Sequence, residues 1–159
     1  VFTATLRDNI AFYTPDVSDD AVRHAIHVVG LDGLLADLPE GLDTVIGNGK
    51  RVLSGGQAQR IALARAFLDK KRRVMIFDEP TAHLDIETEM DLKKRMLPLM
   101  EHRLVFFATH RLHWMKQMDY ILVMNHGELV EQGTFDKLQE KKGYFARLMN
   151  EMRGEKENV

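Results

Sequence analysis

The stretch VMIFDEP, residues 74–80, decides the fold of this chain. Its first four residues form a short apolar run between charged residues, which is typical of a fully buried parallel strand. A second run of this kind follows at residues 104–108, and residues 86–97 between the two runs favour a helix. Strand, helix and strand in this order predict a right-handed βαβ crossover with the two strands paired in parallel.

The predicted helix has a start signal and a stop signal. Asp85 is expected to be its N-cap, and Glu87 and Glu89 suit the positive end of the helix dipole in the first turn. Pro98 lacks the backbone N–H that a helix interior needs, so we expect it to end or kink the helix.

Two adjacent carboxylates, Asp78 and Glu79, follow the first strand. Ligands of open α/β sheets bind at the carboxyl ends of the strands, so both groups stand where chemistry takes place in such folds. Asp78 could hold a magnesium ion through its water ligands, and Glu79 could polarise an attacking water. The competing interpretation is a solvated Asp-Glu pair before a proline turn, and the four apolar residues before the pair weigh against it.

His110 ends the second strand, so the crossover should bring it to the same edge of the sheet as Glu79. A histidine at this edge could donate a hydrogen bond to a terminal phosphate and orient a water. A lone histidine at a strand end is more often structural or solvated, and that interpretation is kept for the other six histidines of the chain.

The stretch GNGKRVLSGGQAQR, residues 47–60, contains two glycine-centred turns. The first turn looks like a phosphate-binding P-loop, but that motif requires Gly, four residues, Gly, Lys and then Ser or Thr. Thr44 and Arg51 occupy the two outer positions of the motif here. An ordinary glycine loop is therefore expected at residues 47–50.

The second turn has a phosphate-binding mechanism of its own. Ser54 and Gln57 have the spacing of a capping box, which predicts a helix over residues 54–69. Gly55 and Gly56 leave backbone N–H groups uncovered at the positive end of that helix, and such an end binds phosphate. Capping logic alone favours a plain N-cap, whereas the full string LSGGQAQR favours the phosphate site.

The remaining segments complete the order of elements. Residues 18–40 predict two helices, with Ser18 as a cap and Gly30 as the break between them, and residues 41–53 look like a loop. A hairpin and two short helices are expected near the C-terminus, over residues 121–131, 134–140 and 142–151. A mainly helical first part therefore precedes an α/β second part.

Composition excludes several classes of protein. The chain has 22 Lys and Arg against 24 Asp and Glu, a formal net charge of -2, so no global basic field indicates nucleic-acid binding. The absence of cysteine excludes disulfides and thiolate metal sites. No apolar run approaches the ~18 residues that cross a bilayer. The chain begins Val-Phe-Thr, with neither a Met nor a signal-peptide pattern, and is expected to be cut from something longer.

Three strings resemble, in this order and at this spacing, the nucleotide-binding domain of an ATP-binding cassette (ABC) protein. They are LSGGQAQRIALARAFL, VMIFDEPTAHLD and ATHR, and the resemblance covers nearly the whole chain. It implies an α/β fold, the C-terminal part of a P-loop NTPase (RecA-like) ABC ATPase domain with its α-helical subdomain. Residues 1–71 would form the helical subdomain and residues 72–159 the C-terminal half of the RecA-like core.

The resemblance assigns an ATP-binding role to the signature turn. Ser54, Gly55, Gly56 and Gln57 match the family signature, which in this family contacts the terminal phosphate of an ATP held by a second cassette. This turn would therefore serve a nucleotide that another subunit carries.

The other motif residues would serve an ATP on the chain's own P-loop. Asp78 matches the Walker B aspartate that holds the metal, and Glu79 matches the catalytic glutamate. His110 matches the catalytic switch histidine, and Asp85 belongs to the D-loop and would bind ATP.

Cofactors, partners and location follow from the same resemblance. ATP and Mg²⁺ are the implied cofactors, and the implied activity is ATP hydrolysis coupled to export. The implied partners are a second ABC nucleotide-binding domain, identical or different, in a head-to-tail dimer, and a transmembrane domain fused upstream, with no nucleic acid. The expected location is the cytoplasmic face of the cell membrane.

Two further segments indicate an exporter. VFTATLRDNI, residues 1–10, resembles the exporter segment after the glutamine loop, and TVIGNGKRVLSGG, residues 44–56, resembles the loop that contacts the coupling helices of the membrane domain. The tail from residue 109 to residue 138 also resembles exporters, including bacterial thiol exporters tied to cytochrome bd assembly. The alternative is a soluble ABC-type ATPase acting on nucleic acid or ribosomes, and the near-neutral charge and these segments weigh against it.

The chain departs from the family pattern in two places. The D-loop has Ala82 and His83 where Ser-Ala is common, which leaves the role of His83 open. The 159 residues contain no P-loop, and the glutamine of the glutamine loop would fall just before Val1. We therefore expect the C-terminal piece of a cassette, inactive and without measurable ATP affinity on its own.

Overall fold

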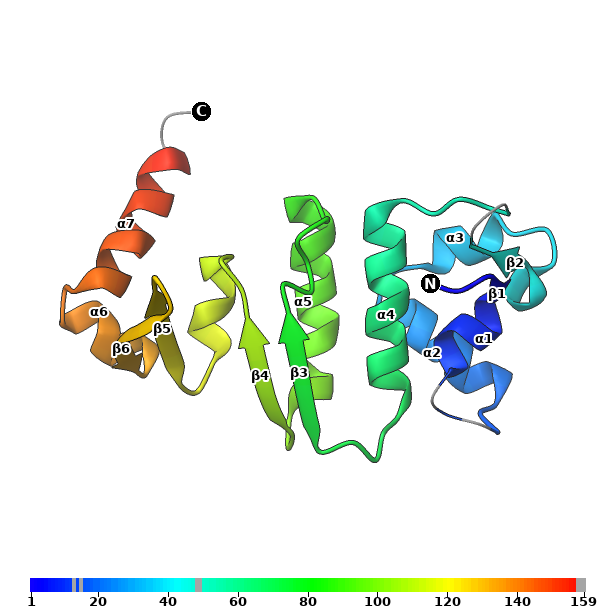
Figure 1. Cartoon of the computed structure of the whole chain (residues 1–159), viewed down its shortest axis with the longest axis horizontal. Coiled ribbons are helices and arrows are strands. Elements are labelled where there is room, and N and C mark those ends of the chain that lie inside the picture. The colour runs from blue at the N-terminus through cyan, green and yellow to red at the C-terminus, as the bar shows by residue number, and fades with distance from the viewer. Residues whose placement is uncertain (13, 15, 48–49, 157–159) are drawn as a thin grey trace. The chain divides into compact units, whose positions relative to one another are not determined.

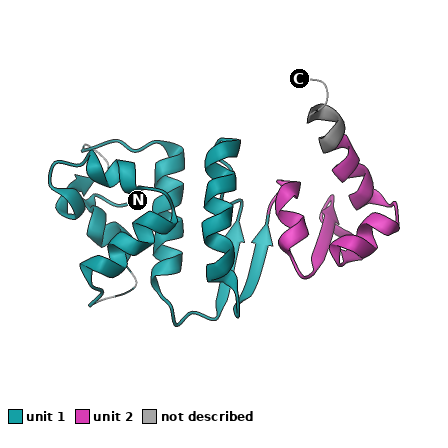
Figure 2. Ribbon diagram, turned by 180° about the vertical axis from the view of Figure 1, so that it is seen from behind, with its two compact units in different colours: residues 1–108 teal, residues 109–159 magenta. Residues whose placement is uncertain are grey.

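The computed structural model describes residues 1–12, 14, 16–47 and 50–156, with side chains as far as residue 151. The chain divides into two compact units, Val1–Ala108 and Thr109–Val159, which Figure 2 shows in different colours. Each unit is described by itself below, with the labels of Figure 1.

The first unit joins a helical part to a parallel strand pair. Its helices and strands are, in chain order, β1 (Ala4–Thr5), α1 (Leu6–Ala11), α2 (Asp19–Val28), α3 (Asp32–Ala36), the 3-10 helix η1 (Gly41–Asp43), β2 (Val45–Ile46), α4 (Gly55–Leu68), β3 (Val74–Asp78), α5 (Ile86–Met100) and β4 (Leu104–Ala108).

The two helices predicted over residues 18–40 are confirmed as α2 and α3. Ser18 caps α2, because its Oγ accepts the amide of Ala21 at 3.3 Å. The helix ends where predicted, since Gly30 adopts a φ of 68°, a left-handed conformation that glycine tolerates best. Its amide donates to the carbonyl of His27 at 3.0 Å.

Helices α1 and α2 both pack on α4, and this contact forms the core of the helical part. The side chains that are fully excluded from solvent there come from all three helices, namely Leu6, Ile10, Val22, Ile26 and Ile61. Their burial follows the helical spacing of apolar residues in the sequence.

Two arginines hold the C-terminal end of α2. Arg60 of α4 donates from Nη1 to the carbonyl of Gly30 at 2.7 Å, and Arg95 of α5 donates from Nη1 to the carbonyl of His27 at 2.8 Å. Cations at this position satisfy the free carbonyls and complement the negative end of the helix dipole. The helical part and α5 are thereby joined through one helix end.

Part of the segment 41–53 that looked like a loop forms a strand. Its residues 45–46 pair antiparallel with β1, in the register Ala4 with Ile46 and Thr5 with Val45. The loop prediction was wrong there because this pairing spans some forty residues and leaves no local signal. The glycine loop predicted at 47–50 includes Asn48 and Gly49, which lie outside the described residues.

Strands β3 and β4 are parallel neighbours, as the βαβ pattern predicts, with α5 between them in the chain. The prediction that they are fully buried was wrong. Met75 and Phe77 are buried, but Ile76 is 76% exposed and Phe106 is 54% exposed. In the described part of the chain only one face of this strand pair is covered, so alternate side chains remain in solvent.

Helix α5 runs past the proline that was expected to end or kink it, so Pro98 does not end the helix. It begins after the predicted cap Asp85 and continues through Pro98 to Met100. Pro98 has no backbone N–H to donate, so the last turn of α5 lacks one helical hydrogen bond.

The second unit confirms the hairpin and the two helices predicted there. Its elements are the 3-10 helix η2 (Leu112–Gln117), β5 (Ile121–Asn125), β6 (Glu128–Gly133), α6 (Phe135–Glu140) and α7 (Tyr144–Lys156). The strands pair antiparallel, and the turn residues His126 and Gly127 have φ values of 47° and 81°. Two left-handed residues in a two-residue turn match the right-handed twist of a hairpin. Trp114 and Phe145 are the largest fully buried side chains of the unit.

Over the described residues, no helix is both long and apolar enough to cross a lipid bilayer. The predicted subdomain boundary between residues 71 and 72 falls between α4 and β3, inside the first unit. It remains a prediction about a complete cassette.

Candidate functional site

The signature turn has the geometry that the capping box predicts. The Oγ of Ser54 accepts the amide of Gln57 at 3.1 Å, and the amide of Ser54 donates to Oε1 of Gln57 at 3.0 Å. These reciprocal bonds fix the start of α4, a helix of 14 residues. Ser54 and Gly55 are exposed and Gly56 is half-buried, so the positive end of α4 faces solvent.

The segment that follows β3 packs against this helix start. A Cβ added to Gly55 would lie 3.5 Å from Cδ2 of His83, and one added to Gly56 would lie 3.1 Å from both the carbonyl oxygen of His83 and Cδ2 of Leu84. Leu84 is buried, which anchors the segment. The structure therefore brings His83 close enough to the signature glycines, 27 residues away in the sequence, that an added methyl group would touch it.

Asp78 and Glu79 lie at the carboxyl end of β3, as predicted. Asp78 pairs with Ala108 at the end of β4, and the amide of Glu79 donates to the carbonyl of Ala108 at 2.9 Å. Asp78 is exposed and Glu79 is half-buried. Glu79 has a φ of 44°, in the left-handed region, which costs a side-chain-bearing residue on the order of 1–3 kcal/mol.

Gln59 joins these two regions; it belongs to the string LSGGQAQR, but no contact was predicted for it. Its Nε2 donates to the carbonyl oxygen of Glu79 at 2.7 Å, and its Oε1 accepts the amide of His83 at 3.2 Å. The partners are 20 and 24 residues away. No periodicity or cap signal reports contacts of that range.

A buried polar pair supports the turn between β3 and α5. The hydroxyl of Thr81 donates to Oε1 of Glu89, and both residues are completely buried. Glu89 was placed correctly in the first turn of α5, at the positive end of the helix dipole, but its burial was not predicted. Burial lowers the pKa of the neighbouring Lys93, and the charge of Glu89 partly opposes that shift. The turn is thus fixed from inside the protein.

Asp85 serves as the N-cap of α5. Its Oδ1 accepts the amide of Thr88 at 2.9 Å and its Oδ2 accepts the hydroxyl of Thr88 at 2.7 Å. The hydrogen bonds from Thr88 hold the pKa of Asp85 below its usual range, so the carboxylate is charged at neutral pH. Its predicted contact with ATP remains a prediction.

His110 belongs to the second unit, two residues after the end of β4. Its side chain is exposed. The other predicted site residues all lie in the first unit, so the role of His110 stays a prediction based on its place in the sequence.

The fit of a metal ion depends on Asp78. Over the described residues there is no group of three or more His, Asp or Glu side chains that could hold a metal ion. Magnesium commonly takes one or two carboxylates and completes its shell with waters and phosphate oxygens. An exposed strand-end carboxylate such as Asp78 fits that kind of site, and does not fit a metal held by protein alone.

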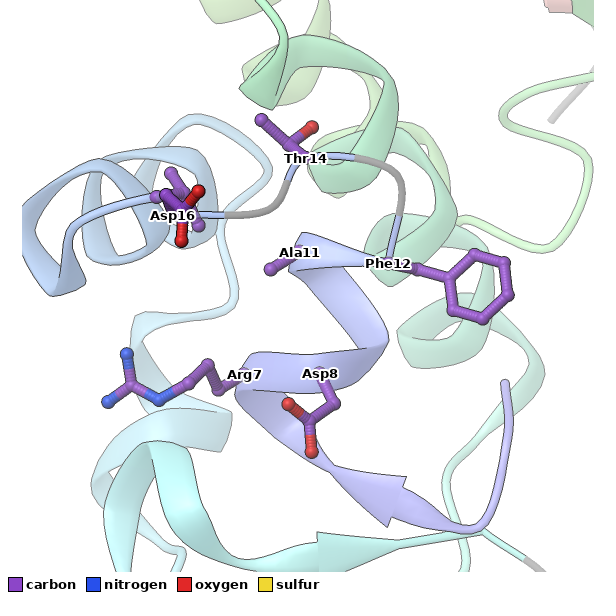
Figure 3. Close-up of a pocket in the computed structure, with 7 residues that line it drawn as sticks. Arg7, Asp8, Ala11, Phe12, Thr14 and Asp16 are labelled. Atoms are coloured by element: carbon purple, nitrogen blue, oxygen red, sulfur yellow. The ribbon is translucent and has the colours of Figure 1, made fainter.

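A surface pocket of about 390 Å³ lies elsewhere in the first unit, beside α1 (Figure 3). Its lining includes Arg7, Asp8, Phe12, Thr14 and Asp16. None of the predicted nucleotide-site residues lines it, so the pocket is separate from the chemistry described above.

Comparison with known proteins gives a consistent family. The family model described as ABC transporter matches residues 3–82, which is half of the chain. Over 156 residues the chain is 51% identical to the glutathione/L-cysteine transport system ATP-binding/permease protein CydC of Bacillus subtilis (strain 168), covering 98% of this chain and 27% of that protein. It is 37% identical over 150 residues to the ATP-dependent lipid A-core flippase of Neisseria meningitidis serogroup B, covering 94% of this chain and 24% of the flippase.

The fold agrees with the sequence matches. A bacterial Atm1-family ABC exporter with ATP bound matches with a TM-score of 0.82 and 35% identity, covering 96% of this chain and 26% of the exporter. The chain thus spans about a quarter of the length of the relatives it matches. The predicted α/β class, part of a P-loop NTPase domain of ABC type, is confirmed. Family model, sequence identity and fold together show that the chain belongs to the ABC transporter family.

Proposed function

We propose that the chain is part of an ATP-hydrolysing subunit of an ABC exporter and carries the signature, Walker B and D-loop motifs of its nucleotide-binding domain. The observation that carries the proposal is the contact between the signature glycines and the segment after Glu79. It brings an exposed positive helix end and a strand-end carboxylate pair into one compact unit. Exporter relatives that are fused ATP-binding and permease proteins support the same function.

In the proposed mechanism the start of α4 and the carboxyl end of β3 serve different nucleotides. Ser54 and Gly56 contact the terminal phosphate of an ATP held by the P-loop of a second cassette, docked head to tail. Glu79 accepts a proton from, or orients, the water that attacks the terminal phosphorus of the other ATP, and the bond to the ADP oxygen breaks.

The remaining roles follow the same division. Asp78 would hold magnesium, which would supply positive charge beside the phosphate oxygens. By its place in the sequence, His110 would serve the ATP on which Glu79 acts, and Asp85 would bind ATP as part of the D-loop.

The partners are then a second nucleotide-binding domain and a transmembrane domain in the same polypeptide, with the cassette on the cytoplasmic face of the membrane. The identity to the Bacillus subtilis glutathione/L-cysteine transport protein makes a small thiol the proposed cargo. The relatives described above are transport proteins, and they give no support to the alternative of an ATPase acting on nucleic acid or ribosomes.

The test is Glu79→Gln in an exporter subunit that carries these residues together with a P-loop and membrane segments. We expect ATP turnover to fall by roughly a hundredfold or more, the size of a general-base contribution. Glutathione transport in membrane vesicles should stop with it, while ATP-dependent dimerisation persists.

Glu87→Gln is the matched control, because Glu87 is an exposed carboxylate in the first turn of α5. It should leave turnover unchanged. Turnover that survives Glu79→Gln would show that Glu79 is not the base.

A further inference from the structure

Gln59 lies on α4, one turn after the signature glycines, and its side chain is half-buried. The two ends of its amide have opposite partners, since Nε2 donates to the carbonyl of Glu79 at 2.7 Å and Oε1 accepts the amide of His83 at 3.2 Å. An amide rotated by half a turn would set donor against donor and acceptor against acceptor. The two bonds therefore fix the side chain in one orientation.

The carbonyl that Gln59 holds belongs to a residue in an uncommon conformation. Glu79 has a φ of 44°, and its backbone is tied at both polar atoms. The amide donates to the carbonyl of Ala108 at 2.9 Å, and the carbonyl accepts the amide of Ala82 at 3.2 Å as well as Nε2 of Gln59. The direction of the Glu79 side chain is set by this backbone, so anything that holds the backbone also aims the carboxylate.

We propose that Gln59 is a positioning residue that transmits the state of the signature turn to the catalytic carboxylate of Glu79. It rests on the proposed function, in which Ser54 and Gly56 bind the phosphate of one ATP and Glu79 acts on the other. Gln59 is rigidly part of the helix whose first turn binds the first phosphate. A shift of that helix moves Nε2 against the carbonyl of Glu79, and the two half-sites of one chain are thereby coupled.

The two bonds of Gln59 can be removed separately. Gln59→Glu keeps an acceptor for the amide of His83 but loses the donor to Glu79, whereas Gln59→Lys keeps a donor and loses the acceptor. Gln59→Leu loses both. Gln132→Leu is the matched control, because Gln132 is an exposed glutamine on β6.

The measurements are kcat and KM for ATP, ATP-dependent dimerisation and melting temperature, in the same complete subunit. For Gln59→Glu and Gln59→Leu we expect kcat to fall by roughly a hundredfold, the cost of misplacing a catalytic group by about 1 Å. Gln59→Lys should retain more of kcat than either. KM, dimerisation and melting temperature should stay at the values of the unaltered protein.

The outcomes distinguish a failure of the positioning role of Gln59 from a failure of the proposed function. If Glu79→Gln abolishes turnover and the Gln59 variants leave kcat unchanged, the positioning role is overturned and the proposed function stands. A parallel loss of kcat, dimerisation and melting temperature, or a better kcat for Gln59→Glu than for Gln59→Lys, also overturns the positioning role. If Glu79→Gln itself retains turnover, the proposed function fails.

Discussion

Glu131 of β6 shows how a single side chain can hold a unit together. The residue is 8% exposed, and its Oε2 accepts the amide of Phe145 in the first turn of α7 at 2.8 Å. The Nζ of Lys141 lies 3.5 Å from Oε1 of Glu131. The hydrogen bond from Phe145 is the main reason why the pKa of Glu131 lies below its ordinary value of 4.5. The charged carboxylate therefore stabilises the start of α7.

This arrangement predicts the pH dependence of stability. A carboxyl group with a lowered pKa in the folded state contributes stability above its unfolded pKa and loses it as the pH falls through the folded value. We expect Glu131→Gln to melt below the unaltered chain at pH 7, with the difference shrinking once the pH falls below the unfolded-state glutamate value of about 4.3 and lost below the lowered folded pKa. Glu128→Gln, an exposed change on the same strand, should show no such difference. A gap that persists unchanged at pH 3 would contradict the assignment.

Single residues also mark what sequence reasoning could and could not find. Ser18, Ser54 and Asp85 were identified as caps because a cap is a local matter, settled within three residues. The contacts of Gln59 were not predicted, because its partners are brought to it by the packing of the whole unit. The burial of Glu89 was not predicted, because a carboxylate is rarely buried; the hydroxyl of Thr81 donates to it, and it interacts with the charge of Lys93.

Among the elements, α2 and α4 begin with the same chemistry and differ in use. Each has a serine N-cap that accepts the amide three residues on, at 3.3 Å from Ser18 and at 3.1 Å from Ser54. Only α4 follows its cap with two glycines. Comparing the two serine caps therefore distinguishes the effect of helix capping from that of phosphate binding.

We expect Ser18→Ala and Ser54→Ala to destabilise the protein by a similar amount, about 1 kcal/mol. Only Ser54→Ala should also weaken ATP-dependent dimerisation in the complete subunit, because only that cap would face a phosphate. Thermal unfolding and analytical ultracentrifugation with ATP measure the two effects. Equal effects of both variants on dimerisation would show that Ser54 acts as a cap alone.

The type and order of the elements were predictable from sequence, but their environment was not. The apolar runs at residues 74–77 and 104–108 were correctly assigned to parallel strands. Whether one or both faces of a strand are covered depends on elements outside the strand, and a run of apolar residues cannot report it. The two-residue strand β2 was missed for the related reason that its partner β1 lies at the start of the chain.

For the molecule as a whole, the sequence contains signature, Walker B and D-loop motifs and no P-loop. The positive end of α4 is a weak phosphate site by itself, because in the proposed function the second cassette supplies most of the contacts to the nucleotide. The described part of the chain also leaves one face of the β3–β4 pair uncovered.

We therefore expect these 159 residues, expressed as an isolated chain, to show no saturable binding of ATP at micromolar concentrations. Calorimetry or a fluorescent ATP analogue measures this directly. Circular dichroism with the helix content of the fold confirms that the chain under test is folded. Saturable micromolar binding by the folded chain would mean that it holds a nucleotide without a P-loop.

An added methyl group has more room at Gly55 than at Gly56, and this difference affects which substitutions can accumulate at the two positions during evolution. At Gly56 a methyl group would lie 3.1 Å from the backbone carbonyl oxygen of His83 and would have to push it aside, so the fold itself disfavours alanine there, whether or not a nucleotide is ever bound. At Gly55 the nearest neighbour is the imidazole of His83, a side chain that can turn aside. A lineage that stopped using this half-site would be free to change Ser54 and Gly55 while keeping Gly56. The residue at position 55, more than the one at position 56, then records whether selection for ATP at this site is still in force.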